Sequence, residues 1–272
     1  MVATIADMFG RAAQARRTAL IPYVTVGFPE LNCTPGLIAT LAAYGADLIE
    51  LGVPFSDPTA DGPVIQHSGQ VALRAGVTLE HCLAAAAASR KLTDVPLVLM
   101  GYYNPFLQFG WDRLMSRAAA AGVVGFIVPD LPPEEGVEFS EQAAAKGLDV
   151  VFMAAPTSSD QRLNLVGRKS RGFVYCVTVK GVTGQRRELS PELPAFLARV
   201  RCFTKLPLAA GFGISSAEHV QEVGRYVDGA VVGSALMAAL DGTTGDVTLE
   251  VAASFIGELS KGAARSDPLG AS

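Results

Sequence analysis

Eight short apolar segments follow one another along the chain, and this pattern limits the possible folds more than any other feature. Each segment is continuously apolar rather than alternating, as expected of strands buried on both faces of a parallel sheet. They begin at Leu20, Asp47, Pro96, Gly125, Leu148, Gly172, Leu206 and Asp228. Stretches with helical patterning separate all of them. Eight strands in strict alternation with helices predict an α/β protein with a closed (β/α)8 barrel, the TIM-barrel fold.

A doubly wound open sheet is the main alternative fold. Such a sheet seldom needs eight parallel strands and would carry a dinucleotide-binding fingerprint, whereas the GFGISS stretch at Gly211 lacks the third glycine. The 272 residues suit one large domain. We therefore assign residues 1–265 to a single barrel domain and 266–272 to a flexible tail. An extra helix, roughly residues 3–17, is expected before the first strand, where it could cover the N-terminal mouth.

Two serines mark the expected starts of helices. Ser158 with Gln161, and Ser215 with Glu218, have the spacing of capping boxes.

Composition excludes several classes of protein. The formal net charge of -4 argues against nucleic acid as the main partner, because phosphate backbones require a basic face. No apolar run approaches the length of a membrane span, and no signal-peptide pattern opens the chain, so we expect a cytoplasmic protein that does not act on membranes. The four cysteines and three histidines show no metal-ligand spacing. We expect no metal site.

The connection after the second strand is unusually long. The second and third apolar segments start 49 residues apart, and residues 53–77 form a proline-rich connection, which in a compact domain is usually functional. In a barrel this connection emerges at the C-terminal face, where active sites are built. Asp57 and Asp61 lie in it.

Glu50 interrupts the second apolar segment. Burial raises the pKa of a carboxyl group, which suits a residue that both takes up and releases protons. A structural glutamate paired with a buried Lys or Arg is the alternative. The expected strands contain neither residue before Lys180, and we therefore predict that Glu50 is an acid/base group.

Glycine-rich turns follow the seventh and eighth apolar segments. These are the loops with which barrels often bind phosphate, and Gly213, Gly233 and Ser234 lie in them. The alternative is that both are simply tight turns. Their presence in both loops favours a phosphate site.

The loop after the sixth segment, KGVTGQRRELS, combines glycines with charged residues. It is either a lid that closes over substrate or a plain solvated loop. As a lid it would bring Thr183 within reach of Asp61. Tyr175, in the sixth segment, either points into the mouth of the barrel or packs in its core.

The stretch LIELGVPFSDPTADGPVIQ resembles the signature of the tryptophan synthase alpha subunit family. The resemblance extends over nearly the whole chain, through the motifs IPYVTVGFP, YYNPF, VPDLPPEE, GVTG, GFGISS and VVGSA, in that order. It implies a lyase of tryptophan biosynthesis that cleaves indole-3-glycerol phosphate by a retro-aldol reaction. It further implies an α2β2 assembly with a beta subunit that receives the indole. The chain would need no cofactor, and any pyridoxal phosphate would belong to the beta subunit.

The resemblance also implies roles for individual residues. Glu50 falls on the family's acid/base, and Asp61 on the carboxylate that accepts the indole N–H. Phosphate contacts fall on Gly184, Gly213, Gly233 and Ser234. Further substrate contacts are expected at Tyr23, Tyr102, Tyr175, Thr183 and Phe212, and partner coupling at Asp57 and Lys180. Tyr23 stands where some members carry Phe, and Lys180 follows Val179 where others have Arg-Ser.

Three other functions remain open from the sequence. A Schiff-base aldolase would use Lys180, although nothing beside Gly181 is expected to depress the pKa of this lysine. A lyase of the same family could release indole without any beta subunit. A catalytically silent barrel could merely activate a partner, and the presence of Glu50 and Asp61 argues against it.

Overall fold

The computed structural model describes residues 3–177, 192–211 and 213–265. Several sequence predictions fall elsewhere: Lys180, Thr183, Gly184, Phe212 and the tail 266–272 lie outside the described residues.

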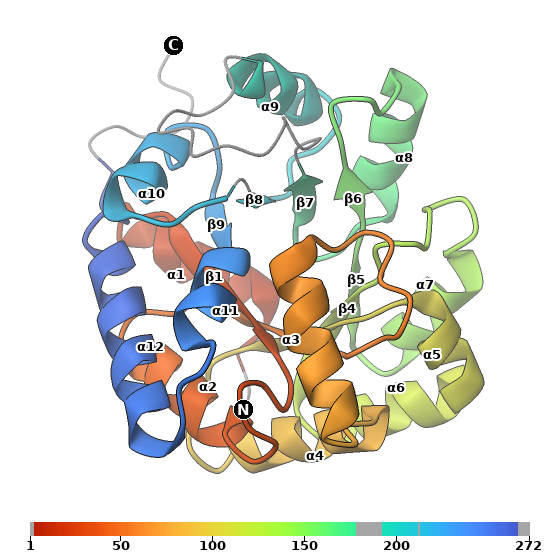
Figure 1. Ribbon diagram of the computed structural model, residues 1–272. Helices are drawn as coiled ribbons and strands as arrows, with labels where there is room; N and C mark the ends of the chain where they lie inside the picture. Colours follow the sequence, from red (N-terminus) through yellow and green to blue (C-terminus); the bar gives the residue numbers. More distant parts are fainter. Residues whose placement is uncertain (1–2, 178–191, 212, 266–272) are drawn as a thin grey trace.

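A single parallel sheet forms the centre of the molecule (Figure 1). Its strands are β1 (Ala19–Thr25), β2 (Ile49–Gly52), β3 (Leu97–Met100), β4 (Val123–Ile127), β5 (Asp149–Val151), β6 (Met153–Ala154), β7 (Val174–Val177), β8 (Leu208–Gly211) and β9 (Gly229–Val232). Neighbouring strands follow the order β5-β4-β3-β2-β1-β9-β8-β7-β6. Each predicted apolar segment supplies strand residues, and the barrel architecture is confirmed.

One predicted strand is divided in two. The segment beginning at Leu148 forms β5, which pairs with β4, and β6, which pairs with β7. Between them the backbone N–H of Phe152 donates to the hydroxyl of Ser170 at 3.1 Å rather than to a neighbouring strand. Because β5 and β6 are the two ends of the sheet order and follow one another in the chain, this segment closes the barrel.

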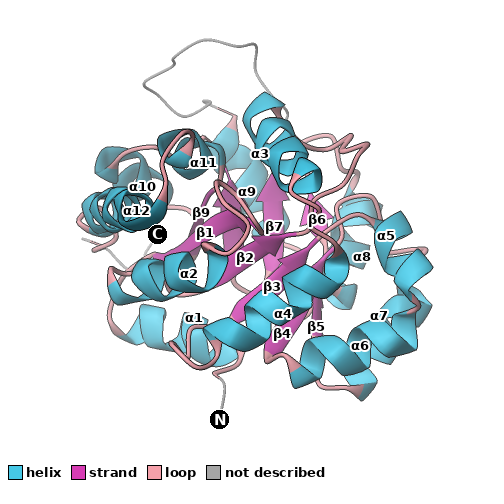
Figure 2. Cartoon of the chain, turned by 60° about the horizontal axis from the view of Figure 1, so that its bottom comes forward, coloured by secondary structure: helices cyan, strands magenta, loops and turns pink. Residues whose placement is uncertain are grey.

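Helices surround the sheet (Figures 1 and 2). They are α1 (Ile5–Gln14), α2 (Thr34–Ala43), α3 (Pro63–Arg74), α4 (Leu79–Ser89), α5 (Tyr103–Phe109), α6 (Trp111–Ala120), α7 (Val137–Ala145), α8 (Asp160–Lys169), α9 (Leu193–Arg201), α10 (Ala217–Val223), α11 (Ser234–Leu240) and α12 (Gly245–Ser260). Within the described ranges no single helix is long and apolar enough to cross a membrane; α3 and α4 reach that length and composition only as a pair bent by 97°.

The predicted helix starts are displaced by one residue. Ser159, not Ser158, caps α8 by accepting from the N–H of Arg162. Ser216, not Ser215, caps α10 in the same way. Consecutive serines offer two candidates for a cap, and the spacing rule selected the wrong one in each case.

Helix α1 closes the N-terminal end of the barrel, as predicted. Thr4 and Asp7 form a capping box that starts it. Its buried face packs against the lower interior of the barrel, in a cluster that includes Phe173. The rings of Phe9 and Phe173 lie 5.6 Å apart. With this end filled, the C-terminal end is left for a site.

The connection after β2 differs from the expected long loop. Helix α3 occupies residues 63–74 of this connection, so its longest irregular part is 53–62. Pro63 starts the helix at a position where proline is favoured, because its missing N–H would be unpaired there in any case.

Candidate active site

A cavity of about 500 Å³ lies at the C-terminal ends of the strands. Of the residues predicted from the sequence, it is lined by Tyr23, Glu50, Asp61, Tyr175, Gly213, Gly233 and Ser234. These come from β1, β2, β7, the loops after β2, β8 and β9, and the first residue of α11. The fold therefore brings together residues that are up to 211 positions apart, counted from Tyr23 to Ser234.

Glu50 is fully buried in the wall of this cavity. It lies on β2 opposite Tyr23 of β1 and Val98 of β3, and its exposed fraction is 0%. Neither carboxyl oxygen has a hydrogen-bond partner among the described residues. Removal from water disfavours the charged form and raises the pKa of Glu50 to about 8.

The arrangement does not support the alternative of a structural ion pair. No described Lys or Arg pairs with Glu50, since burial is the sole cause of its raised pKa. An unpartnered buried carboxyl destabilises a fold, so its presence needs another reason. A group that exchanges its proton near neutral pH is suited to acid/base catalysis.

Two tyrosines face the same space. Burial raises the pKa of Tyr175 well above its usual value, and the charge of Glu50 raises it further. Burial, followed by the charge of Asp61, does the same for the pKa of Tyr23. The Tyr23 hydroxyl lies over Gly52, where an added Cβ would be only 2.0 Å from it. Gly52 is therefore required for this ring position.

Asp61 reaches the cavity from the loop after β2, which is held on both sides. The N–H of Ala60 donates to the Tyr102 hydroxyl at 2.9 Å, and Gln66 of α3 donates to the Asp61 carbonyl at 2.9 Å. The ring of Tyr102 also lies 5.2 Å from that of Phe55. Tyr102 is not among the cavity-lining residues; its contacts support the loop that carries Asp61.

Asp57 lies in the same loop but away from the cavity. Its side chain is exposed, and its carboxylate accepts from the Ser56 hydroxyl. Of the two predicted partner-coupling residues, it is the one that the structure describes.

The loops after β8 and β9 form one end of the cavity. Gly213 has a left-handed backbone, with φ of 69°, and an added Cβ would meet no heavy atom within 4 Å. Helix α11 begins at Ser234, next to Gly233 and on the cavity wall. Backbone N–H groups at the start of a helix favour an anion.

Sequence reasoning missed the apolar part of the lining, which comprises Ile65, Met100, Pro129, Met153, Ala155, Val177, Ile214 and Val231. Met100 and Val177 end their strands. A position at the C-terminal end of a strand is the sequence signal for such a lining residue, but an apolar residue there cannot be distinguished in the sequence from a core residue. These side chains give the cavity an apolar wall.

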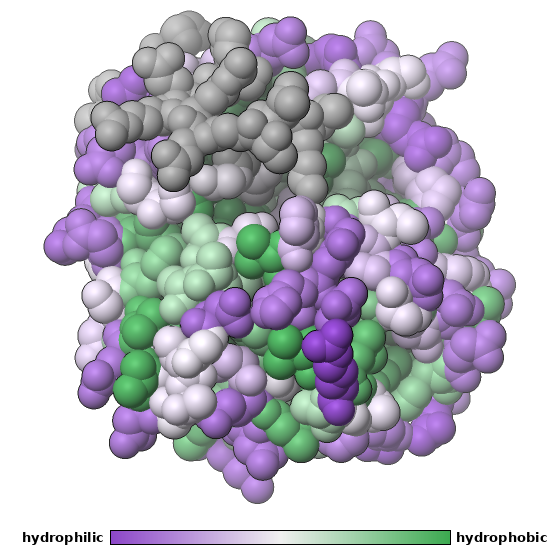
Figure 3. Space-filling view, in the orientation of Figure 1, coloured by the Kyte–Doolittle hydropathy of each residue, from purple (hydrophilic) through white to green (hydrophobic). Residues whose placement is uncertain are grey.

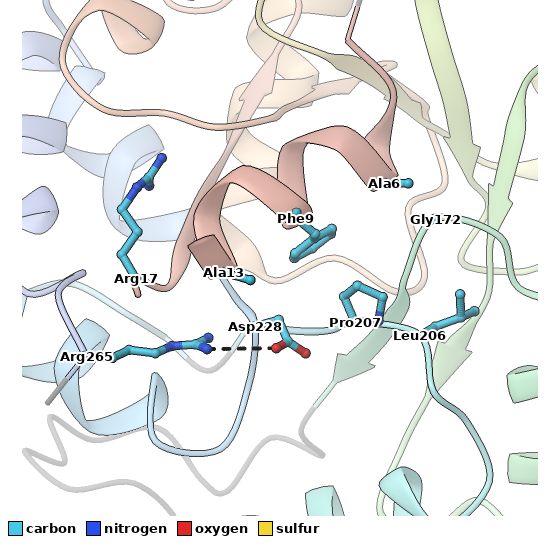
Figure 4. Close-up of a pocket in the computed structure, with 10 residues that line it drawn as sticks. Ala6, Phe9, Ala13, Arg17, Gly172, Leu206, Pro207, Asp228 and Arg265 are labelled. Atoms are coloured by element: carbon cyan, nitrogen blue, oxygen red, sulfur yellow. Dashed lines mark ion pairs between the residues drawn. The ribbon is translucent and has the colours of Figure 1, made fainter. Parts of the chain in front are cut away.

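Two other hollows differ in character from this one. Apolar side chains gather over α11 (Figure 3), and a hollow of about 310 Å³ there is lined by Phe28, Pro63, Val64, His67, Met237, Ala238 and Asp241. Another, of about 320 Å³, lies beside α1 at the N-terminal end of the barrel (Figure 4). Its charged groups pair with acidic residues: Arg265 lies 3.9 Å from Asp228, and Arg17 binds Asp47. In the described part of the chain, no three His, Cys, Asp or Glu side chains gather as metal ligands would.

Comparisons with known proteins show which proteins this chain resembles. The family model of the tryptophan synthase alpha chain matches residues 9–262. The tryptophan synthase alpha chain of Roseiflexus castenholzii is 53% identical over 238 residues, which are 87% of this chain and 91% of the relative. That of Chloroflexus aurantiacus is 46% identical over 262 residues, covering 96% and 98% of the two chains. A solved structure of Mycobacterium tuberculosis tryptophan synthase superimposes with a TM-score of 0.89 at 35% identity, covering 97% of this chain and 99% of that one.

Proposed function

The chain belongs to the tryptophan synthase alpha chain family, a family of lyases, and we propose from this premise that its cavity cleaves indole-3-glycerol phosphate. The products would be indole and glyceraldehyde 3-phosphate. One observation carries the proposal: the fully buried carboxyl of Glu50, which has no hydrogen-bond partner among the described residues, faces an apolar cavity that also holds Asp61.

Glu50 would perform both proton transfers of a retro-aldol cleavage. As an acid it gives its proton to indole C3, and the ring becomes able to accept the electrons of the breaking bond. As a base it then takes the proton of the glycerol hydroxyl next to that carbon, while the C–C bond breaks and the aldehyde forms. The carboxyl thus returns to its protonated form. A pKa of about 8 makes both forms accessible near neutral pH.

Asp61 would act on the other side of the ring. Protonation at C3 places positive charge on the indole nitrogen, and a carboxylate that accepts from the N–H stabilises this charge. Such stabilisation acts on the charge that develops during the reaction, so it lowers the barrier. The contacts of Tyr102 and Gln66 with the loop support a fixed position for Asp61.

The phosphate group would lie at the glycine-rich end of the cavity, against Gly213, Gly233 and Ser234. The start of α11 on the cavity wall supports this placement. Gly184, which lies outside the described residues, would be a further phosphate contact, and Thr183, also outside them, would contact Asp61. The apolar wall of the cavity would hold the indole ring.

We also propose a tryptophan synthase beta subunit as partner, in an α2β2 assembly that passes the indole on. The similarity to a solved tryptophan synthase supports a partner of this kind. The exposed position of Asp57 suits a residue that couples the two subunits. The chain would bring no cofactor of its own, and it would work in the cytoplasm.

The test is to incubate the purified chain with indole-3-glycerol phosphate and to measure both products, with and without beta subunit. Indole and glyceraldehyde 3-phosphate should form in equal amounts, and faster with the beta subunit. An equal rate without it would indicate a stand-alone lyase. No cleavage under either condition would refute the proposal and leave a silent barrel, while borohydride trapping of substrate on the protein would point to an aldolase.

A further inference from the structure

The hydroxyl of Tyr102 lies behind the wall of the cavity, next to the loop that carries Asp61. Tyr102 directly precedes α5 and is 4% exposed, so water has little access to it. It is not among the cavity-lining residues, whereas Ala60 and Asp61 of the loop after β2 are. A residue in this position reaches a bound molecule through its neighbours.

Two hydrogen bonds use both capacities of this hydroxyl. Its oxygen accepts from the N–H of Ala60 at 2.9 Å. It also forms a hydrogen bond with the side chain of Asp61. A phenol has one proton to donate and an ionised carboxylate can only accept, so the proton of Tyr102 goes to Asp61. The hydroxyl thus holds two consecutive residues of the loop, the first by its backbone and the second by its carboxylate.

Tyr102 is itself held in place from the other side. The N–H of Tyr103, the first residue of α5, donates to the Asp130 carboxylate of the loop after β4 at 2.8 Å. The ring of Tyr102 lies 5.2 Å from that of Phe55, which belongs to the same loop as Asp61. Tyr102 therefore joins the loop after β2 to the loops after β3 and β4 and gives it a fixed point of attachment.

We propose that Tyr102 is a positioning residue for Asp61: its hydroxyl holds the carboxylate where it accepts the indole N–H, and Tyr102 affects cleavage through that carboxylate. A carboxylate that is oriented in advance stabilises developing charge without any reorganisation during the reaction. It also has more acceptor positions than one hydroxyl uses, so Asp61 can accept from Tyr102 and from the indole together. This inference rests on the proposed cleavage reaction.

The surroundings of Asp61 favour a neutral donor of this kind. The titratable groups that share its space are Tyr23 on β1, Glu50 on β2 and Tyr175 on β7, together with Tyr102. Burial raises the pKa of all four groups, so they stay protonated at the acidic pH where a carboxylate such as Asp61 titrates. No described Lys, Arg or His lines the cavity. A neutral hydroxyl orients the carboxylate and leaves its negative charge available to the indole nitrogen.

The bond to the carboxylate and the support of the loop backbone can be removed separately. Tyr102→Phe removes the hydroxyl and keeps the ring that packs against Phe55. The titration of Asp61 should then move to higher pH by about one unit, because its ionised form loses a donor. Gln66→Met is the matched control, since it removes the donor to the Asp61 carbonyl and leaves the carboxylate bond intact. It should leave the titration of Asp61 in place.

The same variant separates positioning from direct contact with substrate. Tyr102→Phe should lower the rate of cleavage at saturating substrate by about 10-fold and change KM by less than about threefold. The reason is that a displaced Asp61 carboxylate loses its effect mainly on the charge that develops in the transition state.

The experiment is an NMR pH titration of protein labelled in its aspartate carboxyl groups, with Asp61→Asn used to assign the signal, together with steady-state kinetics of the same variants. A shift in Tyr102→Phe that is absent from Gln66→Met supports the proposal. An unmoved titration in Tyr102→Phe, or equal shifts in both variants, overturns it. A loss confined to KM also overturns it, because it would indicate that Tyr102 contacts substrate directly.

The titration needs no turnover, so it can fail independently of the proposed function. The expected shift in a chain that cleaves no substrate would keep the hold of Tyr102 on Asp61 and refute the proposed function. Cleavage with an unmoved titration would do the reverse.

Discussion

Replacing Glu50 with glutamine should stabilise the protein at alkaline pH, even though the residue is part of the active site. In the folded protein burial raises the pKa of Glu50 to about 8 from 4.5. In the unfolded chain Glu50 ionises near pH 4.5, so between about pH 4.5 and pH 8 the unfolded chain has released a proton that the folded protein retains. The free energy of unfolding of the wild type therefore falls as pH rises through this window.

The size of the effect follows from the two pKa values. The difference between 8 and 4.5 is about 3.5 pH units, and at 1.36 kcal/mol per unit it corresponds to about 5 kcal/mol when the window has been crossed. Between about pH 5.5 and pH 8.5 the wild type should lose about 3 kcal/mol relative to Glu50→Gln. The buried amide has its own cost, but that cost does not change with pH.

Urea unfolding of both proteins at these two pH values measures the difference. Glu250→Gln, at an exposed position on α12, is the matched control and should follow the wild type. The free energies of unfolding of the wild type and Glu50→Gln could instead change with pH in parallel, so that their difference changes by less than about 1 kcal/mol. That result would show that Glu50 does not titrate as a buried carboxyl without a partner.

Three further predictions test other parts of the structure. Gly213→Val should weaken the binding of substrate and of inorganic phosphate while leaving the rate at saturating substrate nearly unchanged. The valine side chain would occupy the open space that an anion needs, and it would strain a backbone with φ of 69°. An unchanged KM, or an unchanged phosphate affinity in calorimetry, would show that Gly213 is not part of the phosphate site. Asp57→Ala, and likewise Lys180→Ala, should reduce stimulation by the beta subunit more than basal activity, and equal losses of both rates would rule out a coupling role. Phe9→Ala should lower the free energy of unfolding by about 3–5 kcal/mol without changing the rate at saturating substrate. The reason is that Phe9 packs against Phe173 at the N-terminal end of the barrel, opposite the cavity. A large fall in the rate would show that the two ends of the barrel are coupled.

The barrel itself could be predicted because continuous apolar segments separated by helices have few other solutions. The details of the barrel depend on contacts between residues that are distant in the sequence, and the pattern of apolar segments does not reveal these contacts. At the break, the N–H of Phe152 donates to the hydroxyl of Ser170, which lies on another part of the chain. The helix caps are displaced because Ser159 and Ser216 each follow another serine. The start of α3 is hidden because Pro63 is as typical of a loop as of a first helical turn.

The charged part of the site is visible in the sequence for a physical reason. A carboxyl in an apolar strand is costly, so the sequence alone marks Glu50 as a residue that needs an explanation. The apolar lining gives no such signal, since Met100 and Val177 would look the same in a core. The substrate contact of Tyr102 stays a prediction, and no local pattern indicates the bond that its hydroxyl accepts from the Ala60 N–H in the loop. The contact of Thr25 with Ser68 joins residues 43 positions apart, and no local pattern indicates it.

The most direct test of the account is the rate of indole-3-glycerol phosphate cleavage by Glu50→Gln at saturating substrate, together with the affinity of this variant for the same substrate. The Kd should be little changed, because the amide has the shape of the carboxyl. The rate should fall by ~10² to 10⁴, the usual effect of removing a general acid/base. Turnover above about a tenth of the wild-type rate would contradict the assignment of Glu50 as the group that moves the protons.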